Sequence, residues 1–334
     1  MNIIVPMAGM GKRMRPHTLT IPKPLIPVVG KPIVQRLVED IAEVCGNDIN
    51  EIAFIIGDFG KEVEESLLKI ADSLGAKGKI CYQEEALGTA HAIYCAKESL
   101  NGPVIVAFAD TLFTADFKLD QSKDGIIWVK KIENPEAFGV VKLDKEGTIT
   151  EFVEKPETFV SDLAIIGIYF FTKGEILEKE IKYLLDNNIT DKGEFQLTNA
   201  LENMKSKGMK FGAGPVNEWL DCGNKDATVY TNQRVLELKK KTEPLRGSNV
   251  VVKNSTVIEP CFLGDNVLIE NSVIGPHVSI GKNSKVMSSI ISNTIVQTNT
   301  ELHNINCKDS MIGNHTKVVN EQQDLSIGDY IQIA

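Results

Sequence analysis

The sequence predicts an α/β domain followed by a parallel β-helix, and two observations support that prediction. Between residue 1 and about residue 240, short apolar runs alternate with segments whose apolar residues recur at helical spacing. From about residue 250, aliphatic residues recur every six positions, with Asn, Gly and Ser between them. We therefore expect two domains, residues 1–240 and 250–334. The first is a Rossmann-like, mostly parallel sheet with helices on both faces, and the second is a left-handed parallel β-helix built from hexapeptide repeats.

The first domain is predicted from its alternation of strands and helices. The predicted strands are residues 2–5, 52–56, 79–82 and 104–108. The predicted helices are residues 32–45, 61–74 and 89–100. Segments that alternate in this way favour a parallel sheet, and ligands bind beyond the carboxyl ends of its strands. We expect one pocket to collect the residues at those ends, which are Met7, Gly57, Gln83 and Asp110.

The second domain is predicted from its six-residue repeat. The residues assigned to the inward-facing tracks are Val251, Val257, Leu263 and Ile269, then Cys261, Val267 and Val273, then Ile274, Ile280 and Val286, with Val278 and Ser284 on a companion track. The pattern becomes irregular in residues 290–318. Residues 227–241 are predicted to form a helix that joins the two halves. A short solenoid of this kind usually has a structural or oligomer-forming role, so we expect a homo-oligomer.

Composition narrows the class of protein. The chain has 334 residues, is 43% hydrophobic and 24% charged, and carries a formal net charge of −9. Such an acidic chain lacks the basic face that nucleic acids or anionic membranes require. The N-terminus shows no secretory signal pattern, no apolar run could span a membrane, and the six cysteines form no Cys-x-x-Cys pair. We therefore expect a cytoplasmic protein that binds small molecules, with no nucleic-acid or membrane partner.

One stretch differs from this acidic background. Residues 7–25 place several basic side chains around Gly9 and Gly11, with prolines at positions 16, 22 and 24. Glycine lets backbone N–H groups approach a phosphate, while Arg13 offers paired donors and Lys23 a point charge. The loop therefore predicts a site for a small anion. Its spacing does not fit a phosphate-binding P-loop, and Met14 replaces the third glycine of a dinucleotide fingerprint.

The same stretch resembles the start of the sugar-1-phosphate nucleotidyltransferase (nucleotide-sugar pyrophosphorylase) family. Residues 8–18 match the family pattern A-G-x-G-T-R-[LM]-x-P-x-T except at Lys12, and residues 22–33 match P-K-x-L-x-P-V-x-x-K-P-[MI]. Matching segments then follow along nearly the whole chain: QEEALGTAHAI (83–93), FADTLF (108–113), FGVV (138–141), EKP (154–156), GEFQLTNAL (193–201) and WLDCGN (219–224). The resemblance implies that a sugar-1-phosphate oxygen attacks the α-phosphorus of a nucleoside triphosphate, releasing pyrophosphate with the assistance of Mg²⁺.

The resemblance also implies roles for individual residues. Arg13 and Lys23 are the implied catalytic residues, which would neutralise phosphate charge. The implied nucleotide-binding residues are Ala8, Gly9, Gly11, Gln83, Gly88 and Thr89. The implied sugar-phosphate-binding residues are Gly139, Glu154 and Lys155. Asp110 and Asp221 are the implied ligands of one Mg²⁺, a cation that takes oxygen ligands.

The substrates are narrowed by shorter matches. Gln83 with Leu87-Gly88-Thr89 resembles the pyrimidine branches of the family, so we expect dTTP or UTP, with guanine and adenine left open. Residues 164–171 (AIIGIYFF) resemble the glucose-type pattern, so we expect glucose 1-phosphate. Two positions depart from the family: Lys12 replaces Thr or Ser, and Thr111 replaces the Asn that commonly follows the aspartate.

Two alternatives to this function stay open. The first is an N-acetylglucosamine-1-phosphate uridylyltransferase whose β-helix also transfers an acetyl group. It would need a general base, for which the candidates are His277, His303 and His315. The second is a non-catalytic regulatory relative. The presence of Arg13, Lys23, Asp110 and Asp221 favours an enzyme.

Overall fold

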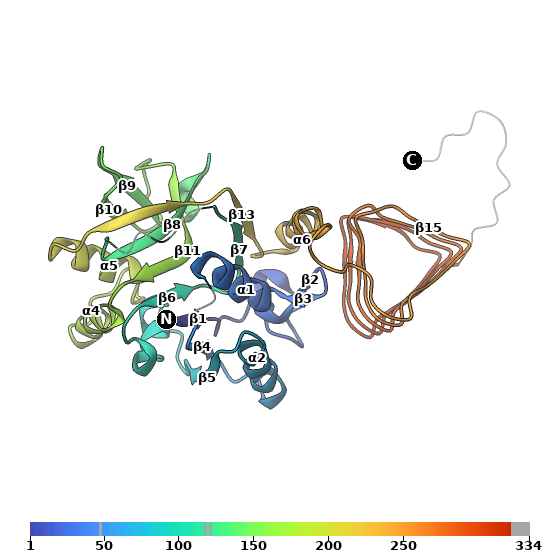
Figure 1. Ribbon diagram of the computed structural model, residues 1–334, viewed down its shortest axis with the longest axis horizontal. Helices are drawn as coiled ribbons and strands as arrows, with labels where there is room; N and C mark the ends of the chain where they lie inside the picture. Colours follow the sequence, from blue (N-terminus) through green and yellow to red (C-terminus); the bar gives the residue numbers. More distant parts are fainter. Residues whose placement is uncertain (47–48, 117–118, 120–121, 322–334) are drawn as a thin grey trace. The chain divides into compact units, whose positions relative to one another are not determined.

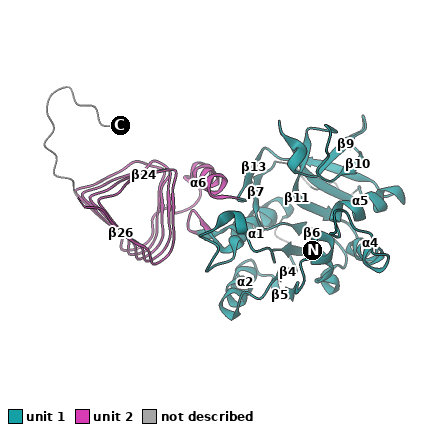
Figure 2. Ribbon diagram, turned by 180° about the vertical axis from the view of Figure 1, so that it is seen from behind, with its two compact units in different colours: residues 1–26, 31–223 teal, residues 27–30, 224–334 magenta. Residues whose placement is uncertain are grey.

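The computed structural model describes residues 1–46, 49–116, 119 and 122–321, which divide into two compact units (Figure 2). The first unit comprises residues 1–26 and 31–223, and the second comprises residues 27–30 and the chain from residue 224 onward. Residues 322–334, which the sequence assigns to the β-helix domain, lie outside the described residues. All six cysteines are free thiols. Within the described part of the chain, no helix combines the length and apolarity needed to cross a membrane.

The first unit is built on a nine-stranded sheet with the order β10-β9-β11-β6-β1-β4-β5, and β8 joins β12 to β11 (Figure 1). The strands are β1 (Asn2–Pro6), β4 (Glu51–Ile56), β5 (Lys77–Tyr82), β6 (Val104–Ala107), β8 (Gly125–Lys131), β9 (Val140–Leu143), β10 (Ile149–Val153), β11 (Leu163–Phe171) and β12 (Phe211–Pro215). The run β6-β1-β4-β5 is parallel, whereas β11 pairs antiparallel with β6, β8 and β9. The predicted α/β sheet is therefore confirmed, with antiparallel strands added on one side.

Helices cover both faces of this sheet. They are α1 (Ile33–Cys45), α2 (Lys61–Ser73), α3 (Thr89–Tyr94), α4 (Gly174–Asp186) and α5 (Leu197–Ser206), with 3₁₀ helices η1 (Lys12–Met14), η2 (Lys23–Leu25), η3 (Lys97–Ser99) and η4 (Pro135–Ala137). The apolar sides of α3, α4 and α5 share one buried core with Ile4 of β1 and with Val104 and Val106 of β6. Because side chains alternate across a strand, the other residues of β1 face the side on which α1 and α2 lie (Figure 1).

One predicted helix is wrong in its length. The sequence predicts a helix over residues 89–100, but α3 ends at Tyr94 and a separate 3₁₀ turn covers Lys97–Ser99. The cause is tertiary. The backbone carbonyl of Ser99 accepts a hydrogen bond from Asn2 Nδ2 at 2.9 Å, and its hydroxyl donates to Glu51 Oε1 at 2.6 Å. These contacts hold residue 99 against β1 and β4, so the chain bends there before β6 begins.

The first unit also contains a two-stranded antiparallel sheet. It pairs β7 (Thr111–Thr114) with β13 (Glu218–Asp221), and Asp221 lies opposite Thr111. The remaining short strands are β2 (Pro27–Val28), in the second unit, and β3 (Lys31–Pro32), in the first. The β7–β13 pairing matters for the site because it joins segments more than a hundred residues apart.

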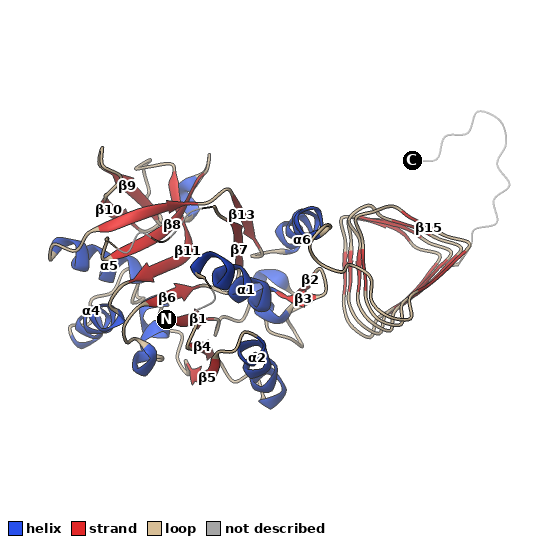
Figure 3. Cartoon of the chain, in the orientation of Figure 1, coloured by secondary structure: helices blue, strands red, loops and turns tan. Residues whose placement is uncertain are grey.

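The second unit contains α6 (Lys225–Lys239) and then three parallel sheets of short strands joined by turns (Figure 3). The first sheet contains β14 (Val251–Lys253), β17 (Leu268–Glu270), β20 (Lys285–Met287), β23 (Glu301–His303) and β26 (Lys317–Val319). The second contains β15 (Thr256–Val257), β18 (Val273–Ile274), β21 (Ile290–Ser292) and β24 (Asn306–Lys308). The third contains β16 (Phe262–Leu263), β19 (Ser279–Ile280), β22 (Ile295–Val296) and β25 (Met311–Ile312). This arrangement confirms the predicted parallel β-helix.

Two of the predicted inward-facing residues are wrong. Val251 and Val273 are 40% and 37% exposed. Their neighbours face inward instead, because Val252 packs against the β-helix core and Ile274 belongs to it. The reason is the length of a coil. Val252 pairs with Ile269, 17 residues later, so a strict count in sixes slips by one position per coil. The expected irregularity after residue 290 is also wrong, because the strands continue to Val319 in coils of 16 residues, as between Glu301 and Lys317.

Candidate active site

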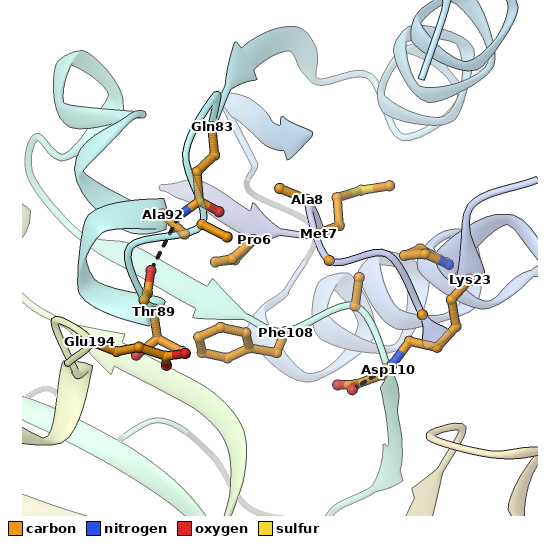
Figure 4. Close-up of a pocket in the computed structure, with 16 residues that line it drawn as sticks. Pro6, Met7, Ala8, Lys23, Gln83, Thr89, Ala92, Phe108, Asp110 and Glu194 are labelled. Atoms are coloured by element: carbon orange, nitrogen blue, oxygen red, sulfur yellow. Dashed lines mark hydrogen bonds and ion pairs between the residues drawn. The ribbon is translucent and has the colours of Figure 1, made fainter. Parts of the chain in front are cut away.

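Two adjoining cavities of the first unit collect the site residues implied by the resemblance. Gly57, which the sequence analysis places in the same pocket as Met7, Gln83 and Asp110, lines a different cavity instead. Of the two adjoining cavities, the first has a volume of about 280 Å³ and the second about 480 Å³. The walls of both include Thr89, Phe108 and Asp110. The predicted residues that line the first cavity are Ala8, Gly9, Gly11, Lys23, Gln83, Gly88, Thr89 and Asp110 (Figure 4). Those that line the second are Arg13, Thr89, Asp110, Gly139, Glu154, Lys155 and Asp221.

The glycine-rich loop that follows β1 forms one wall of the first cavity. Gly11 adopts a left-handed backbone with φ 57°, and a side chain there would meet the Cβ of Lys23 at 2.9 Å. The hydroxyl of Thr18 donates to the Gly11 carbonyl at 2.9 Å, and Met14 is fully buried. The loop is therefore folded back on itself and anchored, which holds Lys23 beside the cavity. Lys12 is exposed and lines neither cavity.

Lys23 and Asp110 form an ion pair where the two cavities meet. Lys23 Nζ lies 2.7 Å from Asp110 Oδ2, and the side chains are 13% and 35% exposed. Figure 4 shows this pair on one side of the first cavity and Gln83 on the other. Asp110 follows β6, and Thr111 after it is buried, with its hydroxyl donating to the carbonyl of Ile166 at 2.9 Å. The pair therefore joins the glycine-rich loop to the end of the central parallel strands.

Asp221 lies near Asp110 because β13 pairs with β7. The backbone N–H of Cys222 donates to the Asp110 carbonyl at 2.9 Å, directly after the paired residue Asp221. Burial and the neighbouring Asp110 carboxylate raise the pKa of Asp221, while Lys23, the Gly223 N–H and Arg13 oppose that rise. A side chain at Gly223 would meet the Asp221 carboxylate at 3.0 Å and Arg13 Nη2 at 3.2 Å. The site thus holds two carboxylates and two cations close together.

The two aspartates are chemically suited to a divalent cation such as Mg²⁺. Asp221 is a desolvated carboxylate beside a second carboxylate, an arrangement that a cation stabilises. Among the described residues, no cluster of three or more His, Cys, Asp or Glu side chains could hold a metal. Mg²⁺ typically uses one or two protein carboxylates and completes its shell with phosphate oxygens and water. Asp110 and Asp221 match that donor set.

Gly88 and Thr89 are fixed by the segment before α5. The Phe195 N–H donates to the Leu87 carbonyl at 2.8 Å, and the Ala90 N–H donates to the Phe195 carbonyl at 2.9 Å. The Thr89 hydroxyl donates to Gln196 Oε1 at 3.1 Å. These bonds tie the start of α3 to residues 195–196. Gln196 lines the second cavity and belongs to the matched segment 193–201, so it joins the predicted site residues as one that the sequence analysis missed.

One end of the second cavity carries the charged side chains of Glu154 and Lys155. A side chain at Gly139 would meet Glu154 Oε2 at 3.0 Å, so the glycine leaves room beside that carboxylate. Lys155 has a left-handed backbone with φ 42°, and its Nζ lies 3.6 Å from Glu154 Oε1. The Thr198 hydroxyl donates to Glu154 Oε2 at 3.4 Å. This end of the cavity offers both a cation and hydrogen-bond acceptors.

Sequence reasoning assigned no role to the aromatic residues of the second cavity, although the matched segments contain or adjoin them. They are Phe108, Phe138, Tyr169 and Trp219. Phe108 packs edge-on against Tyr169 with ring centroids 6.2 Å apart, and Phe138 packs against Trp219 at 4.8 Å. These aromatic residues lie in the segments FADTLF, FGVV, IGIYFF and WLDCGN, and that position in the sequence could have predicted that they line the site. Such rings supply apolar area against which a sugar ring could pack.

The three histidines considered for acetyl transfer belong to the second unit. His277 Nε2 lies 2.7 Å from Glu237 Oε1, and His315 occupies a turn with φ 53°. His303 is half-buried, and its Nδ1 has no hydrogen bond among the described residues. A cavity of about 480 Å³ in this unit is lined by residues between Lys240 and Leu263 and includes none of these histidines.

Comparison with known proteins agrees with the matched segments. Residues 2–237 match the model of the Nucleotidyl transferase family. The chain is similar to the Bifunctional protein GlmU of Methanocaldococcus jannaschii, with 34% identity over 270 residues that cover 78% of this chain and 60% of the relative. It is also similar to the low-salt glycan biosynthesis nucleotidyltransferase Agl11 of Haloferax volcanii, with 32% identity over 249 residues, 70% of this chain and 66% of the relative. The chain thus spans about three fifths of the first relative's length.

Solved structures show the same fold. The structure of a UDP-glucose pyrophosphorylase complexed with UDP-glucose superposes with a TM-score of 0.58 at 24% identity, over 71% of this chain and 98% of that one. A nucleoside-diphosphate-sugar pyrophosphorylase from Vibrio cholerae RC9 gives a TM-score of 0.60 at 20% identity, over 69% and 99%. Since the family model covers most of the chain, the protein belongs to the Nucleotidyl transferase family.

Proposed function

We propose that this protein transfers a nucleotidyl group from a nucleoside triphosphate to a sugar 1-phosphate. In this reaction an oxygen of the sugar phosphate bonds to the α-phosphorus, the bond from that phosphorus to the bridging oxygen breaks, and pyrophosphate leaves. The observation that supports this proposal best is the pair of adjoining cavities that share Asp110. The first would hold the triphosphate and base, and the second the sugar 1-phosphate.

The charges of the site suit this chemistry. The attacking sugar phosphate is already an anion, so no general base is required. Nucleotidyl transfer then depends on positioning and on neutralising phosphate charge. Lys23 lies at the junction of the cavities, where it would draw the two anionic substrates together. Arg13, on the wall of the second cavity beside Asp221, would neutralise charge on the phosphates.

We propose that Asp110 and Asp221 hold one Mg²⁺ when substrate is bound. The ion would neutralise phosphate charge and orient the phosphate oxygens. In the structure, Lys23 pairs with Asp110, and Lys23 and Arg13 offset part of the charge of Asp221. Lys155 would bind the sugar's phosphate, with Glu154 and the open space at Gly139 receiving sugar hydroxyls.

The preferred substrates in this proposal are dTTP or UTP with glucose 1-phosphate. The test is pyrophosphate release, with Mg²⁺, from dTTP, UTP, ATP, GTP and CTP, each paired with glucose, N-acetylglucosamine, galactose and mannose 1-phosphates. Release confined to dTTP or UTP with glucose 1-phosphate is the expected result. Another productive pair would overturn the substrate assignment and keep the reaction class. No release from folded protein with any pair would refute the proposed function and favour a non-catalytic regulatory role.

A further inference from the structure

We propose that His91 orients the side-chain amide of Gln83, so that Gln83 selects nucleobases that carry a ring N–H group. His91 is thus a positioning residue for base selection. The inference rests on the proposed function, because it concerns the nucleotide that occupies the first cavity. It goes beyond a role for Gln83 alone, since it explains which end of the amide faces the base and what holds it there.

Two acceptors engage the amide nitrogen of Gln83. Gln83 Nε2 lies 3.2 Å from the Gly88 carbonyl oxygen and 3.2 Å from His91 Nδ1. A carbonyl oxygen only accepts hydrogen bonds, so the group that faces Gly88 must be the NH₂ end of the amide. The Gly88 carbonyl is itself held in place, because it also accepts the Ala92 N–H at 3.1 Å within α3. This backbone contact therefore identifies the NH₂ end of the amide.

The second contact fixes the form of the histidine. The NH₂ group carries two hydrogens and accepts none, so His91 Nδ1 must present its lone pair. His91 is then the neutral tautomer with its proton on Nε2, and both hydrogens of Gln83 Nε2 are used inside the protein. Without His91 Nδ1, one hydrogen of Gln83 Nε2 loses its acceptor and only the contact with the Gly88 carbonyl still holds the amide, so the amide would turn over more easily and present NH₂ to the cavity.

The oxygen of the amide is left for a ligand. Within the described part of the chain, the side-chain hydrogen bonds of Gln83 are made by Nε2, and no group donates to Oε1. In Figure 4 the labelled Gln83 side chain reaches into the first cavity with its oxygen turned toward Ala8. Gln83 also lines a third cavity of about 830 Å³, which shares Ala8, Gly9 and Ala86 with the first and leaves room for a base. His91 lines none of these three cavities, so it acts through Gln83 rather than by touching the nucleotide.

A fixed acceptor discriminates between bases. Uracil and thymine present N3–H to such an oxygen, and guanine presents N1–H. The matching ring nitrogen of cytosine or adenine is an acceptor and would face the lone pairs of Gln83 Oε1. A site built to make a polar contact rejects a ligand that leaves its group unpaired. UTP and CTP differ at this edge and share the same sugar and triphosphate, so they form the sharpest pair for a test.

The experiment compares kcat/KM for UTP and CTP in the full-length protein and its variants. His91→Leu keeps apolar bulk and removes the acceptor, and we expect it to lower the UTP-to-CTP ratio about five- to tenfold, through KM for UTP and with kcat nearly constant. His91→Asn should recover most of the ratio, because Asn Oδ1 can accept in place of Nδ1. His91→Gln, whose amide reaches the Nε2 position instead, should behave like His91→Leu and serves if that variant fails to fold.

A double-mutant cycle separates this role from a structural one. In a Gln83→Ala background, His91→Leu should leave the UTP-to-CTP ratio unchanged within about twofold, because the group that it orients is gone. The matched control is His303→Leu, which removes a half-buried histidine whose Nδ1 makes no hydrogen bond among the described residues. The control should not change the ratio.

The outcomes distinguish the inference from the function on which it rests. Absence of pyrophosphate release by the unmodified protein with every nucleotide would refute the proposed function, and this inference with it. An active protein whose UTP-to-CTP ratio is unaltered by His91→Leu and His91→Gln would refute the inference alone. So would an equal loss in the Gln83→Ala background.

Discussion

Replacement of Gly88 by alanine should disrupt the wall of the first cavity, where we propose that the nucleotide binds, without altering any charged group. Gly88 has φ 114°, which L-residues rarely adopt, and an added Cβ would lie 2.5 Å from the Phe195 carbonyl oxygen and 2.7 Å from its nitrogen. Both atoms are backbone, so neither can turn aside as a flexible side chain would. The start of α3 and residue 195 must therefore separate.

The expected cost follows from these contacts. A non-glycine residue at such a φ costs about 1–3 kcal/mol. Separating the two segments also breaks the hydrogen bonds from Phe195 N–H to Leu87 and from Ala90 N–H to Phe195, each worth about 1 kcal/mol. Gly88→Ala should therefore lower the free energy of unfolding of the first unit by about 3–5 kcal/mol, and it should raise KM for the nucleotide at least about tenfold.

Tryptophan fluorescence during urea unfolding measures this effect selectively, because both tryptophans, Trp128 and Trp219, lie in the first unit. The matched control is Gly208→Ala. Gly208 has φ 94°, but nothing lies within 4 Å of its added Cβ, so it reports backbone strain without the clash. If Gly88→Ala is no more destabilised than Gly208→Ala and its KM for the nucleotide is unaltered, the argument from close packing against Phe195 is wrong.

Three further predictions address other parts of the protein. Lys23→Met should reduce kcat/KM about 10²–10³-fold in the pyrophosphate assay with the fold intact, and near-normal activity would contradict its role in charge neutralisation. Burial and Asp110 raise the pKa of Asp221, so the ionised carboxylate opposes folding above its ordinary pKa of 3.8. Asp221→Asn should thus melt at a higher temperature than the unmodified protein at pH 7, and the difference in melting temperature should disappear as the pH falls toward 3.8. The same variant should lose activity. A melting temperature below that of the unmodified protein at pH 7 would refute the stability argument. Ile291→Ala, at a fully buried β-helix position, should cost the second unit about 2–5 kcal/mol by calorimetry and leave the tryptophan transition unchanged.

The elements of both units were predictable because their signals are local. The period of the apolar residues indicates a helix or a strand within a few residues, and the glycines and basic residues of the loop after β1 lie together in the sequence. The resemblance then supplied distant residues such as Asp221. The length of a coil was harder to predict, because a coil of 17 or 16 residues is only slightly shorter than three hexapeptide repeats. As a result, Val251 and Val273 were assigned to the wrong face.

The sequence by itself determined the order of strands and helices, the cationic glycine-rich loop and the repeat of the β-helix, since each depends on neighbours along the chain. Only the tertiary structure decided which side chains meet. The pairing of β13 with β7 brings Asp221 to Asp110, and the contact with Phe195 requires glycine at position 88. The Gly88 carbonyl and His91 Nδ1 together set the direction of the Gln83 amide. No periodicity encodes these contacts, because they arise where strand ends and loops distant in sequence are packed against one another.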